Sequence, residues 1–207
     1  MSSPELPLVA IYADESCLGN GREGDNPGGA GALLEYRRRN GALERRDLWV
    51  SESATTNNRM ALRSVIETFR SLAKPARVVF TSDSRYLIDG LREWVFGWAA
   101  RGWTRKGGAI ENLALWGDAI EAVREGRHQV AWRWVRGHNG HPQNEYANHL
   151  ATRAAAEQSA SESLVPSGFD AWLGTQRQLR PMAEFPDATA FVASRPLPLP
   201  PARSARR

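Results

Sequence analysis

The chain has 207 residues, of which 42% are hydrophobic, and 27 Lys and Arg against 23 Asp and Glu give a formal net charge of +4. This composition suits one medium-sized domain with a smaller extension. No segment has the length of a membrane span, the N-terminus lacks the pattern of a secretory signal, and the single Cys17 excludes an internal disulfide. We therefore expect a cytoplasmic protein with no membrane-bound part.

The basic residues are almost all Arg, with Lys74 and Lys106 as the only lysines. A basic, Arg-rich chain suits phosphate recognition, although a G+C-rich coding bias would also favour Arg. The chain also has eight Trp, but most large aromatic residues belong to cores, so they do not by themselves indicate base stacking. Composition is thus compatible with a nucleic-acid partner without requiring one.

Three strands are predicted in the first quarter of the chain. Residues 8–13 are an apolar run that ends at Asp14, and residues 32–36 and 47–51 have the same character. A glycine-rich loop, residues 19–31, and a short turn connect them. Consecutive strands joined by such loops indicate an antiparallel meander.

From Asn57 the apolar period changes to that of a helix, and the helix is expected to end at Lys74 and Pro75. A strand over residues 77–81 follows and ends beside Asp83. A strand reached through a helical crossover lies parallel to an earlier one. We therefore expect Asp14 and Asp83 at the same edge of the sheet.

The next part alternates helices and one more strand. Residues 86–91, 94–101, 110–124 and 144–157 have helical patterns, residues 129–136 alternate as a strand, and residues 101–108 form a basic, glycine-containing loop. This order predicts an α/β fold with a five-stranded mixed sheet, three antiparallel strands followed by parallel crossovers, flanked by helices.

We divide the chain into a domain at residues 7–158 and an extension at residues 159–207. The extension is predicted to hold a linker at 159–163, a short helix at 169–179 and a flexible Pro- and Arg-rich tail. The partner of this tail, if it has one, is not indicated by the sequence.

Several motifs in a fixed order give the chain a family resemblance. They are Asp14, the run Thr55-Thr56-Asn57-Asn58-Arg59-Met60, the run Thr81-Ser82-Asp83-Ser84, the tryptophans Trp94, Trp98 and Trp103, and the run Gly137-His138-Asn139-Gly140-His141-Pro142-Gln143-Asn144-Glu145. With these, the chain resembles bacterial type 1 ribonuclease H from about Val9 to Ala156, apart from an insertion near residues 22–26. The resemblance implies the RNase H-like fold.

The resemblance also implies an activity and a site. That family cuts the RNA strand of RNA/DNA hybrids with two Mg²⁺ ions held by four acidic side chains, a donor set that suits a hard divalent cation. Asp14 matches the first acid, Asp83 matches the third, and His138 matches a loop histidine that assists proton transfer or product release.

Two of the four acids are missing. The second position is Ala61, which offers no ligand, and the fourth is Asn148, which keeps an oxygen without a charge. Glu15, directly after Asp14, and Glu145, one turn before Asn148, are the candidate replacements. Strand alternation, however, points Glu15 away from Asp14 unless the strand has already ended at that position. We expect Mg²⁺ or Mn²⁺ to bind weakly.

Substrate contacts are carried over from the family position by position. The matching residues are Ser16, Cys17, Asn20, Thr56, Asn57, Asn58 and Met60 for the groove and phosphates, and Trp94, Arg101, Trp103, Arg105 and Lys106 for a basic projecting segment. Taken singly, each has a structural explanation such as a helix cap, a core side chain or a solvated loop charge.

Two functional hypotheses follow. The first is a metal-dependent endoribonuclease acting on RNA/DNA hybrids, with activity weakened by Ala61 and Asn148. The second is a catalytically inactive module that binds hybrids or other nucleic acid. A monomer is the family default.

Overall fold

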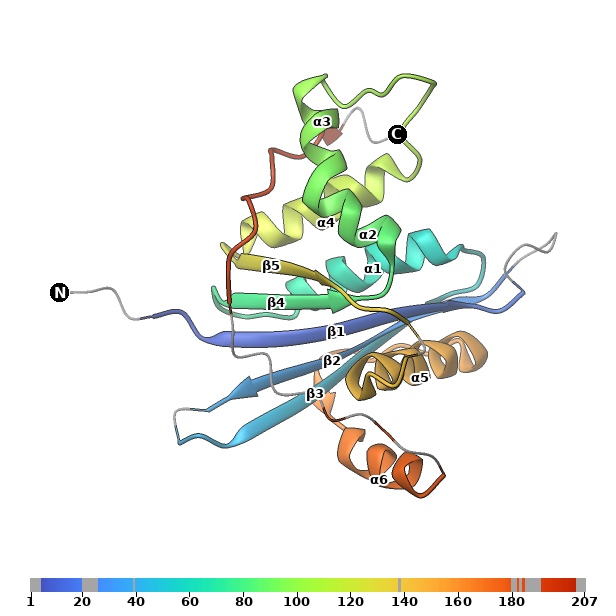
Figure 1. Cartoon of the computed structure of the whole chain (residues 1–207). Helices are drawn as coiled ribbons and strands as arrows, with labels where there is room; N and C mark the ends of the chain where they lie inside the picture. The colour runs from blue at the N-terminus through green and yellow to red at the C-terminus, as the bar shows by residue number, and fades with distance from the viewer. Residues whose placement is uncertain are drawn as a thin grey trace.

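The computed structural model describes residues 5–19, 26–38, 40–137, 139–179, 182, 184 and 191–203. Within these ranges one mixed sheet has the strand order β5-β4-β1-β2-β3-β6 (Figure 1). The strands are β1 (Leu8–Cys17), β2 (Gly28–Arg37), β3 (Leu43–Glu52), β4 (Arg77–Ser82), β5 (Gln129–Trp134) and β6 (Val165–Pro166). The pairs β1–β2, β2–β3 and β3–β6 are antiparallel, and β1–β4 and β4–β5 are parallel.

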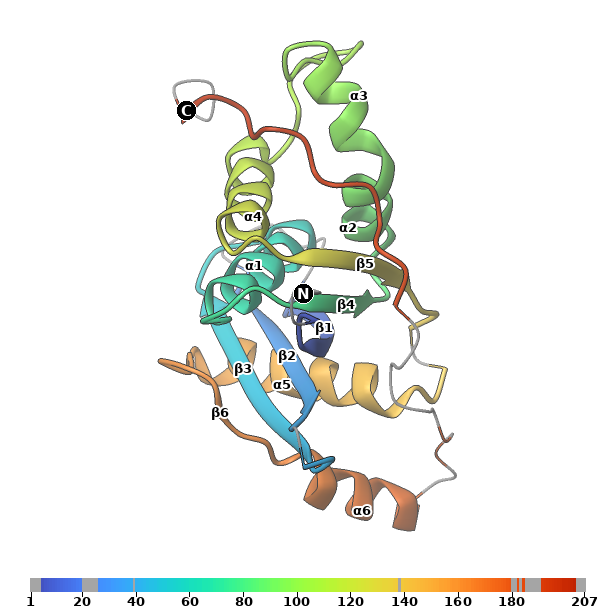
Figure 2. The same cartoon turned by 90° about the vertical axis from the view of Figure 1, so that its left-hand side faces the viewer.

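Helices cover both faces of this sheet. They are α1 (Asn57–Arg70), α2 (Arg85–Asp89), the π-helix η1 (Gly90–Trp94), α3 (Val95–Ala100), α4 (Leu113–Glu125), α5 (Pro142–Glu157) and α6 (Phe169–Leu179). Figures 1 and 2 show α1 and α4 on one face and α5 on the other, with α3 projecting beyond the sheet. The predicted α/β fold with a helix-flanked mixed sheet is confirmed.

The largest core lies between the sheet and α1. The predicted apolar stripe of α1 is buried, and Leu62, Val65 and Phe69 each have at most 1% of their surface exposed. Thr56 caps the helix because its Oγ1 accepts a hydrogen bond from the backbone N of Arg59. This capped amphipathic helix begins beside the end of β1, where Sγ of Cys17 hydrogen-bonds to the carbonyl O of Thr55.

Helix α5 approaches the opposite face unusually closely. A Cβ atom on Gly31 of β2 would lie 2.5 Å from the carbonyl oxygen of Ala147 and 2.6 Å from the backbone N of Ala151, and Gly29 is equally tight against α5. Glycine is thus required because helix backbone rests directly on strand backbone. This close approach carries the first turns of α5 to the end of β1.

Strand β1 is longer than its apolar run. It continues past Asp14 to Cys17 because β2 begins at Gly28 and pairs with Cys17 at that end. On its other side, the parallel register pairs Leu8 with Arg77 and Tyr12 with Thr81. The same offset sets Asp14 level with Asp83, as the sequence predicted.

The sheet has one strand more than the predicted five. β6 is only two residues long and pairs with β3, and the backbone N of Ser161 donates to the carbonyl O of Trp49 at 2.9 Å, so the segment after α5 lies along the β3 edge. At the opposite edge, the backbone N of Ser194 donates to the carbonyl O of Val130 at 2.8 Å. Parts of the extension therefore cover both sheet edges, which sequence periodicity did not predict. The division of the chain at residue 158 stays a prediction.

Strands β2 and β3 each begin four residues before the predicted start, at Gly28 and Leu43, and α1 ends at Arg70, before the predicted end at Lys74. The predicted helices at 86–91 and 94–101 form one run, α2 through η1 to α3, and α4 begins at Leu113 instead of residue 110 because Asn112 takes a left-handed conformation, with φ 56°. The short helix predicted at 169–179 is α6, with the same bounds. None of the helices in the described ranges is long and apolar enough to span a membrane.

Candidate active site at the carboxyl end of the parallel strands

Asp14 lies near the end of β1 with 7% of its surface exposed. Its Oδ2 accepts a hydrogen bond from Nδ2 of Asn144 at 3.3 Å, and its Oδ1 accepts one from the backbone N of Glu15 at 2.7 Å. Burial, followed by repulsion from Asp83, raises the pKa of Asp14 to about 8. Such a carboxyl group takes up a proton at neutral pH unless a cation compensates its charge.

Glu15 projects to the opposite face of the sheet from Asp14. Alternation groups it with Ala13 and Ile11, which pack in the core that also contains Ala61 of α1. Burial raises the pKa of Glu15 well above its usual value, and the charges of Asp14 and Asp83 raise it further. The Glu15 carboxyl group therefore interacts electrostatically with Asp14 and Asp83, although its side chain leaves the opposite face of β1.

One oxygen of Glu15 has no protein partner. Oε2 is buried and, among the described residues, makes no hydrogen bond. A side-chain hydrogen bond with Ser84 lowers the pKa of Glu15 but does not offset the effect of burial. A buried carboxylate oxygen without a donor is costly, so a bound cation would stabilise it.

Asp83 follows β4 and is held by two features of the chain. The indole Nε1 of Trp134 donates to the main-chain carbonyl O of Asp83 at 2.9 Å. Gly137 lies against the carboxylate, since a Cβ atom there would come within 2.0 Å of Oδ2 of Asp83. The carboxyl side chain is therefore confined between β5 and the loop that follows it.

The two positions that depart from the family pattern lie in different surroundings. Ala61 has no exposed surface and packs in the main core. Asn148 is partly exposed, and its Oδ1 accepts a hydrogen bond from Oγ1 of Thr152 at 3.3 Å. Because Asn148 follows Asn144 by one helical turn, it lies on the same side of α5 as the residue that contacts Asp14.

Glu145 is engaged elsewhere. Its Oε1 accepts a hydrogen bond from the backbone N of Gly140 at 2.8 Å, which fastens the loop before α5 to the helix. The charge that acts on Asp14 is that of Asp83, and the charges that act on Glu15 are those of Asp14 and Asp83; Glu145 is not among them. Of the two candidate replacements, Glu15 is the one that shares the electrostatic cluster.

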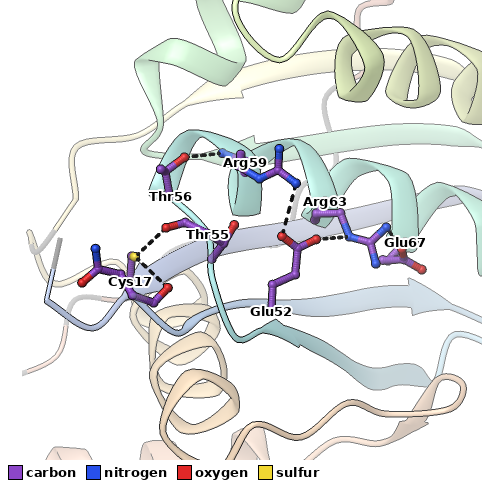
Figure 3. Close-up of polar contacts among 8 residues, drawn as sticks. Cys17, Glu52, Thr55, Thr56, Arg59, Arg63 and Glu67 are labelled. Atoms are coloured by element: carbon purple, nitrogen blue, oxygen red, sulfur yellow. Dashed lines mark hydrogen bonds and ion pairs between the residues drawn. The ribbon is translucent and has the colours of Figure 1, made fainter. Parts of the chain in front are cut away.

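The first turn of α1 borders this edge (Figure 3). Cys17 Sγ donates to the carbonyl O of Thr55 at 3.5 Å and so ties the end of β1 to the loop before α1. Thr56 is exposed, and Asn57 and Asn58 are partly exposed. Oδ1 of Asn57 is buried and without a hydrogen bond within the described ranges.

Other predicted contact residues divide into accessible and inaccessible ones. Met60 has no exposed surface, so its burial in the core argues against the predicted contact with a substrate. Ser16 is partly exposed near the end of β1. Asn20 and His138 lie outside the described residues.

The predicted basic segment forms the projecting part of the fold. Arg101, Arg105 and Lys106 are exposed, and Trp94 is 38% exposed. Trp103 is partly buried against the main core and takes a left-handed conformation, with φ 63°. A segment with exposed cations and anchored aromatic side chains is suited to a polyanion.

The sequence profile of the RNase H family matches residues 7–156. The chain belongs to the ribonuclease H family.

Curated relatives agree with this assignment. A ribonuclease H from Methylococcus capsulatus is 41% identical over 165 residues, covering 79% of this chain and 99% of the relative. A ribonuclease H from Erythrobacter litoralis is 46% identical over 155 residues, covering 74% of this chain and all of the relative. Both relatives are matched along nearly their whole length, and part of this chain lies outside each alignment.

Solved structures of similar proteins support the assignment of the fold, and the description of one of them bears on the carboxylates. The crystal structure of LC9-RNase H1, described as a type 1 RNase H with the type 2 active-site motif, is 60% identical, has a TM-score of 0.85, and covers 96% of this chain and 97% of that chain. The RNase H domain of PFV, at 16% identity and a TM-score of 0.61, shows the fold alone.

Sequence reasoning missed three residues that arrange the ribonuclease H carboxylates. Asn144 holds Asp14, Trp134 holds the main chain of Asp83, and Ser84 hydrogen-bonds with Glu15. Ser84 and Asn144 belong to the quoted motifs, but no spacing rule assigns them a partner. Their contacts are between residues far apart in the chain, so only the folded structure identifies them.

The donor set fits a hard divalent cation in chemistry but is not assembled around one. Carboxylate and amide oxygens are the ligands that Mg²⁺ prefers. Within the described ranges, no three His, Cys, Asp or Glu side chains already have the spacing of a metal site. The carboxylates of Asp14, Glu15 and Asp83 would therefore have to converge when a cation binds.

Proposed function

We propose that this ribonuclease H hydrolyses the RNA strand of RNA/DNA hybrids with divalent metal, and that Glu15 supplies the carboxylate missing at position 61. The observation that carries the proposal is the buried Glu15 carboxyl, whose pKa is raised by both Asp14 and Asp83 and whose Oε2 lacks a partner. Three mutually repelling carboxyl groups at one sheet edge have a charge that a divalent cation would neutralise.

The geometry explains how a residue on β1 can replace one on α1. The family position on α1, Ala61, and the side chain of Glu15 face the same core on the same side of the sheet. Alternation therefore directs Glu15 toward α1, which is the side from which the missing carboxylate would come. The adjacent Asp14 would supply a carboxylate on the other face of the sheet, where it contacts Asn144 of α5.

In this mechanism the side chains have separate tasks. Asp14, Glu15 and Asp83 would hold the cation, with Asn148 as a weaker oxygen donor on α5. Asn144 and Trp134 restrain Asp14 and the main chain of Asp83. Bound Mg²⁺ or Mn²⁺ would polarise the scissile phosphate and make water a better nucleophile.

In this proposal the substrate is recognised by residues at the start of α1 and on the basic projecting segment. Thr56, Asn57 and Asn58 at the start of α1 present polar groups to the minor groove and its 2′-hydroxyls, which distinguish RNA from DNA. The exposed Arg101 and Arg105 of the projecting segment meet phosphates. His138 remains the predicted proton carrier.

A cleavage assay with matched variants tests the proposal. Labelled RNA/DNA hybrid is incubated with Mg²⁺ or Mn²⁺ and with the protein, Glu15→Gln, Asp83→Asn or Glu145→Gln. We expect Glu15→Gln and Asp83→Asn to reduce cleavage by at least about 100-fold, because each removes a charged ligand. Glu145→Gln should stay within a few-fold, since its amide oxygen can still accept from Gly140.

Two results would overturn parts of this assignment. Full cleavage by Glu15→Gln together with loss in Glu145→Gln would transfer the role to Glu145. Binding of the hybrid in a gel shift without cleavage in either metal would establish the alternative, a hybrid-binding module. A duplex with deoxyribose in both strands is the substrate control and should remain uncut.

A further inference from the structure

The C-terminal strap, defined as residues 191–203, lies against the domain along much of its length. Besides the bond from Ser194 to Val130, Oγ of Ser194 accepts from the backbone N of Trp132 at 3.2 Å. Leu197 is 6% exposed and belongs to the main core, and its carbonyl O accepts from Nη1 of Arg124 at 2.7 Å. The strap is therefore anchored on β5 and α4.

From these anchors the strap reaches the projecting part of the fold. The guanidinium of Arg195 lies 4.3 Å from the ring centroid of Phe96, which belongs to α3. Further along, Nη2 of Arg203 lies 3.3 Å from Oε1 of Glu121 on α4. Figure 2 shows the strap passing from the β5 side to the region of α3 and α4.

The handle, defined as α3 with the loop at residues 101–108, is also attached to the domain through Phe96, Trp98 and Trp103, which pack against the main core. Val95 is buried, and the ring of Trp98 meets that of Trp116 edge to face, with centroids 5.5 Å apart. These contacts hold the base of α3 against α4. The contact between Arg195 and Phe96 braces α3 from the strap, independently of α4.

We propose that the strap is a brace that orients the handle toward the hybrid, with Arg195 as the positioning residue. This inference rests on the proposed function, because it assigns the handle to substrate phosphates. An oriented handle loses less conformational freedom on binding, so bracing strengthens the hybrid complex without touching the reaction. Arg195 then acts through Phe96 and makes no contact with the nucleic acid.

Affinity measurements on hybrids of increasing length test the brace. Binding is measured in Ca²⁺, which is added to limit cleavage, and cleavage of a short hybrid is measured separately in Mg²⁺. We expect Arg195→Ala to weaken binding of long hybrids about two- to fivefold, the effect of losing an exposed cation–π contact. Short hybrids that do not reach the handle should bind and be cut as before.

Three variants distinguish bracing from other effects. Phe96→Leu should match Arg195→Ala, and the double variant should be no weaker than either single one, because both remove the same contact. Arg195→Lys, which keeps the charge but replaces the guanidinium that lies over the Phe96 ring, should also weaken binding. Arg177→Ala on α6, an exposed arginine far from the handle in Figure 1, controls for net charge.

The salt dependence of binding decides whether Arg195 contacts the substrate. A brace leaves the slope of log affinity against log salt unchanged in Arg195→Ala, whereas a lost phosphate contact lowers it by about one. A lowered slope, additive effects of Arg195→Ala and Phe96→Leu, or unchanged affinity for long hybrids would overturn the inference. Failure of the proposed function would instead show as absent cleavage of the short hybrid by the unaltered protein.

Discussion

Asp14 and Glu15 are neighbours on β1 whose carboxyl groups leave opposite faces of the sheet, and yet burial and then the charges of Asp14 and Asp83 raise the pKa of Glu15. The relationship is possible because β1 extends beyond the end of β4, so that both faces of the strand open at the same edge. In the proposed site, one carboxylate would come from the α5 side of the sheet and one from the α1 side.

The first prediction concerns the stability of the protein without metal. The folded-state pKa of Glu15 is raised, so the folded protein holds more protons than the unfolded chain above pH 4.5, and stability falls as pH rises. In EDTA at pH 7.5, Glu15→Gln should therefore unfold at a higher temperature than the unaltered protein. Thermal unfolding with EDTA and then Mg²⁺ checks this.

The same variant should lose the response to metal. Mg²⁺ should raise the unfolding temperature of the unaltered protein more than that of Glu15→Gln, because the variant has lost a charged ligand. A destabilised variant in EDTA, or an equal response to Mg²⁺, would contradict the prediction.

The second prediction moves the carboxylate back to α1. Ala61→Glu alone should lower the free energy of unfolding by about 2–4 kcal/mol, since the side chain at position 61 is fully buried and Glu15 already brings a charge to that side. In combination with Glu15→Gly, it should restore part of the cleavage lost in Glu15→Gly. A double variant as inactive as Glu15→Gly would show that position 61 does not face the carboxylates.

The third prediction adds the fourth acid. Asn148→Asp should lower the Mg²⁺ concentration needed for half-maximal cleavage by about tenfold, because ligand charge raises affinity for a hard cation. Thr152→Ala is the matched control, since it removes only the hydroxyl that donates to Asn148. An unchanged Mg²⁺ requirement in Asn148→Asp would place this side chain outside the metal site.

The fourth prediction tests the support of Asp83. Trp134→Phe keeps a ring beneath the guanidinium of Arg85, which lies 4.0 Å from the indole centroid, but removes the hydrogen bond to Asp83. We expect kcat to fall several-fold with little change in hybrid affinity, and stability to fall by about 1 kcal/mol. Trp94→Phe, which has a similar exposure, should instead affect affinity. The reverse pattern would refute the assignment.

The fifth prediction concerns pH and His128. Burial lowers the pKa of His128, and its Nδ1 accepts from the backbone N of Ala76 at 3.2 Å. Its contribution to stability is present above the unfolded value near 6.5 and is lost as pH falls through the folded value, because the unfolded chain takes up the proton first. Urea unfolding at pH 7.5 and pH 5 should show this loss.

His128→Asn separates this histidine from the others. Its Oδ1 can accept from Ala76 without titrating, so the difference in stability between the two pH values should become smaller. Part of it should persist, because burial also lowers the pKa values of His141 and His149. A difference unaffected by His128→Asn would assign the pH dependence to other groups.

Much of the fold follows from local patterns. The stripe of α1 and the apolar runs of β1 and β4 predicted the elements, and the crossover rule predicted that Asp14 and Asp83 share an edge. The strand ends were less predictable, because β1 is extended by its partner β2 and not by its own apolar residues. The positions of β6 and the strap were not predictable from local patterns. β6 pairs with β3 and the strap bonds to β5, and these are the two sheet edges that the rest of the fold leaves uncovered.

The sequence by itself determined the family, the order of the elements and the two acids Asp14 and Asp83, because those depend on motifs and periodicities that lie within short stretches. The reason for proposing Glu15 over Glu145 as the replacement carboxylate comes from the tertiary structure, which brings Glu15 under the charges of Asp14 and Asp83. Strand alternation predicts that the Glu15 side chain leaves the opposite face of β1 from Asp14. Whether that face is open to solvent or lies beside the other carboxylates depends on where β4 ends and where α1 packs. The direction of a side chain is local, whereas its surroundings are set by the whole fold.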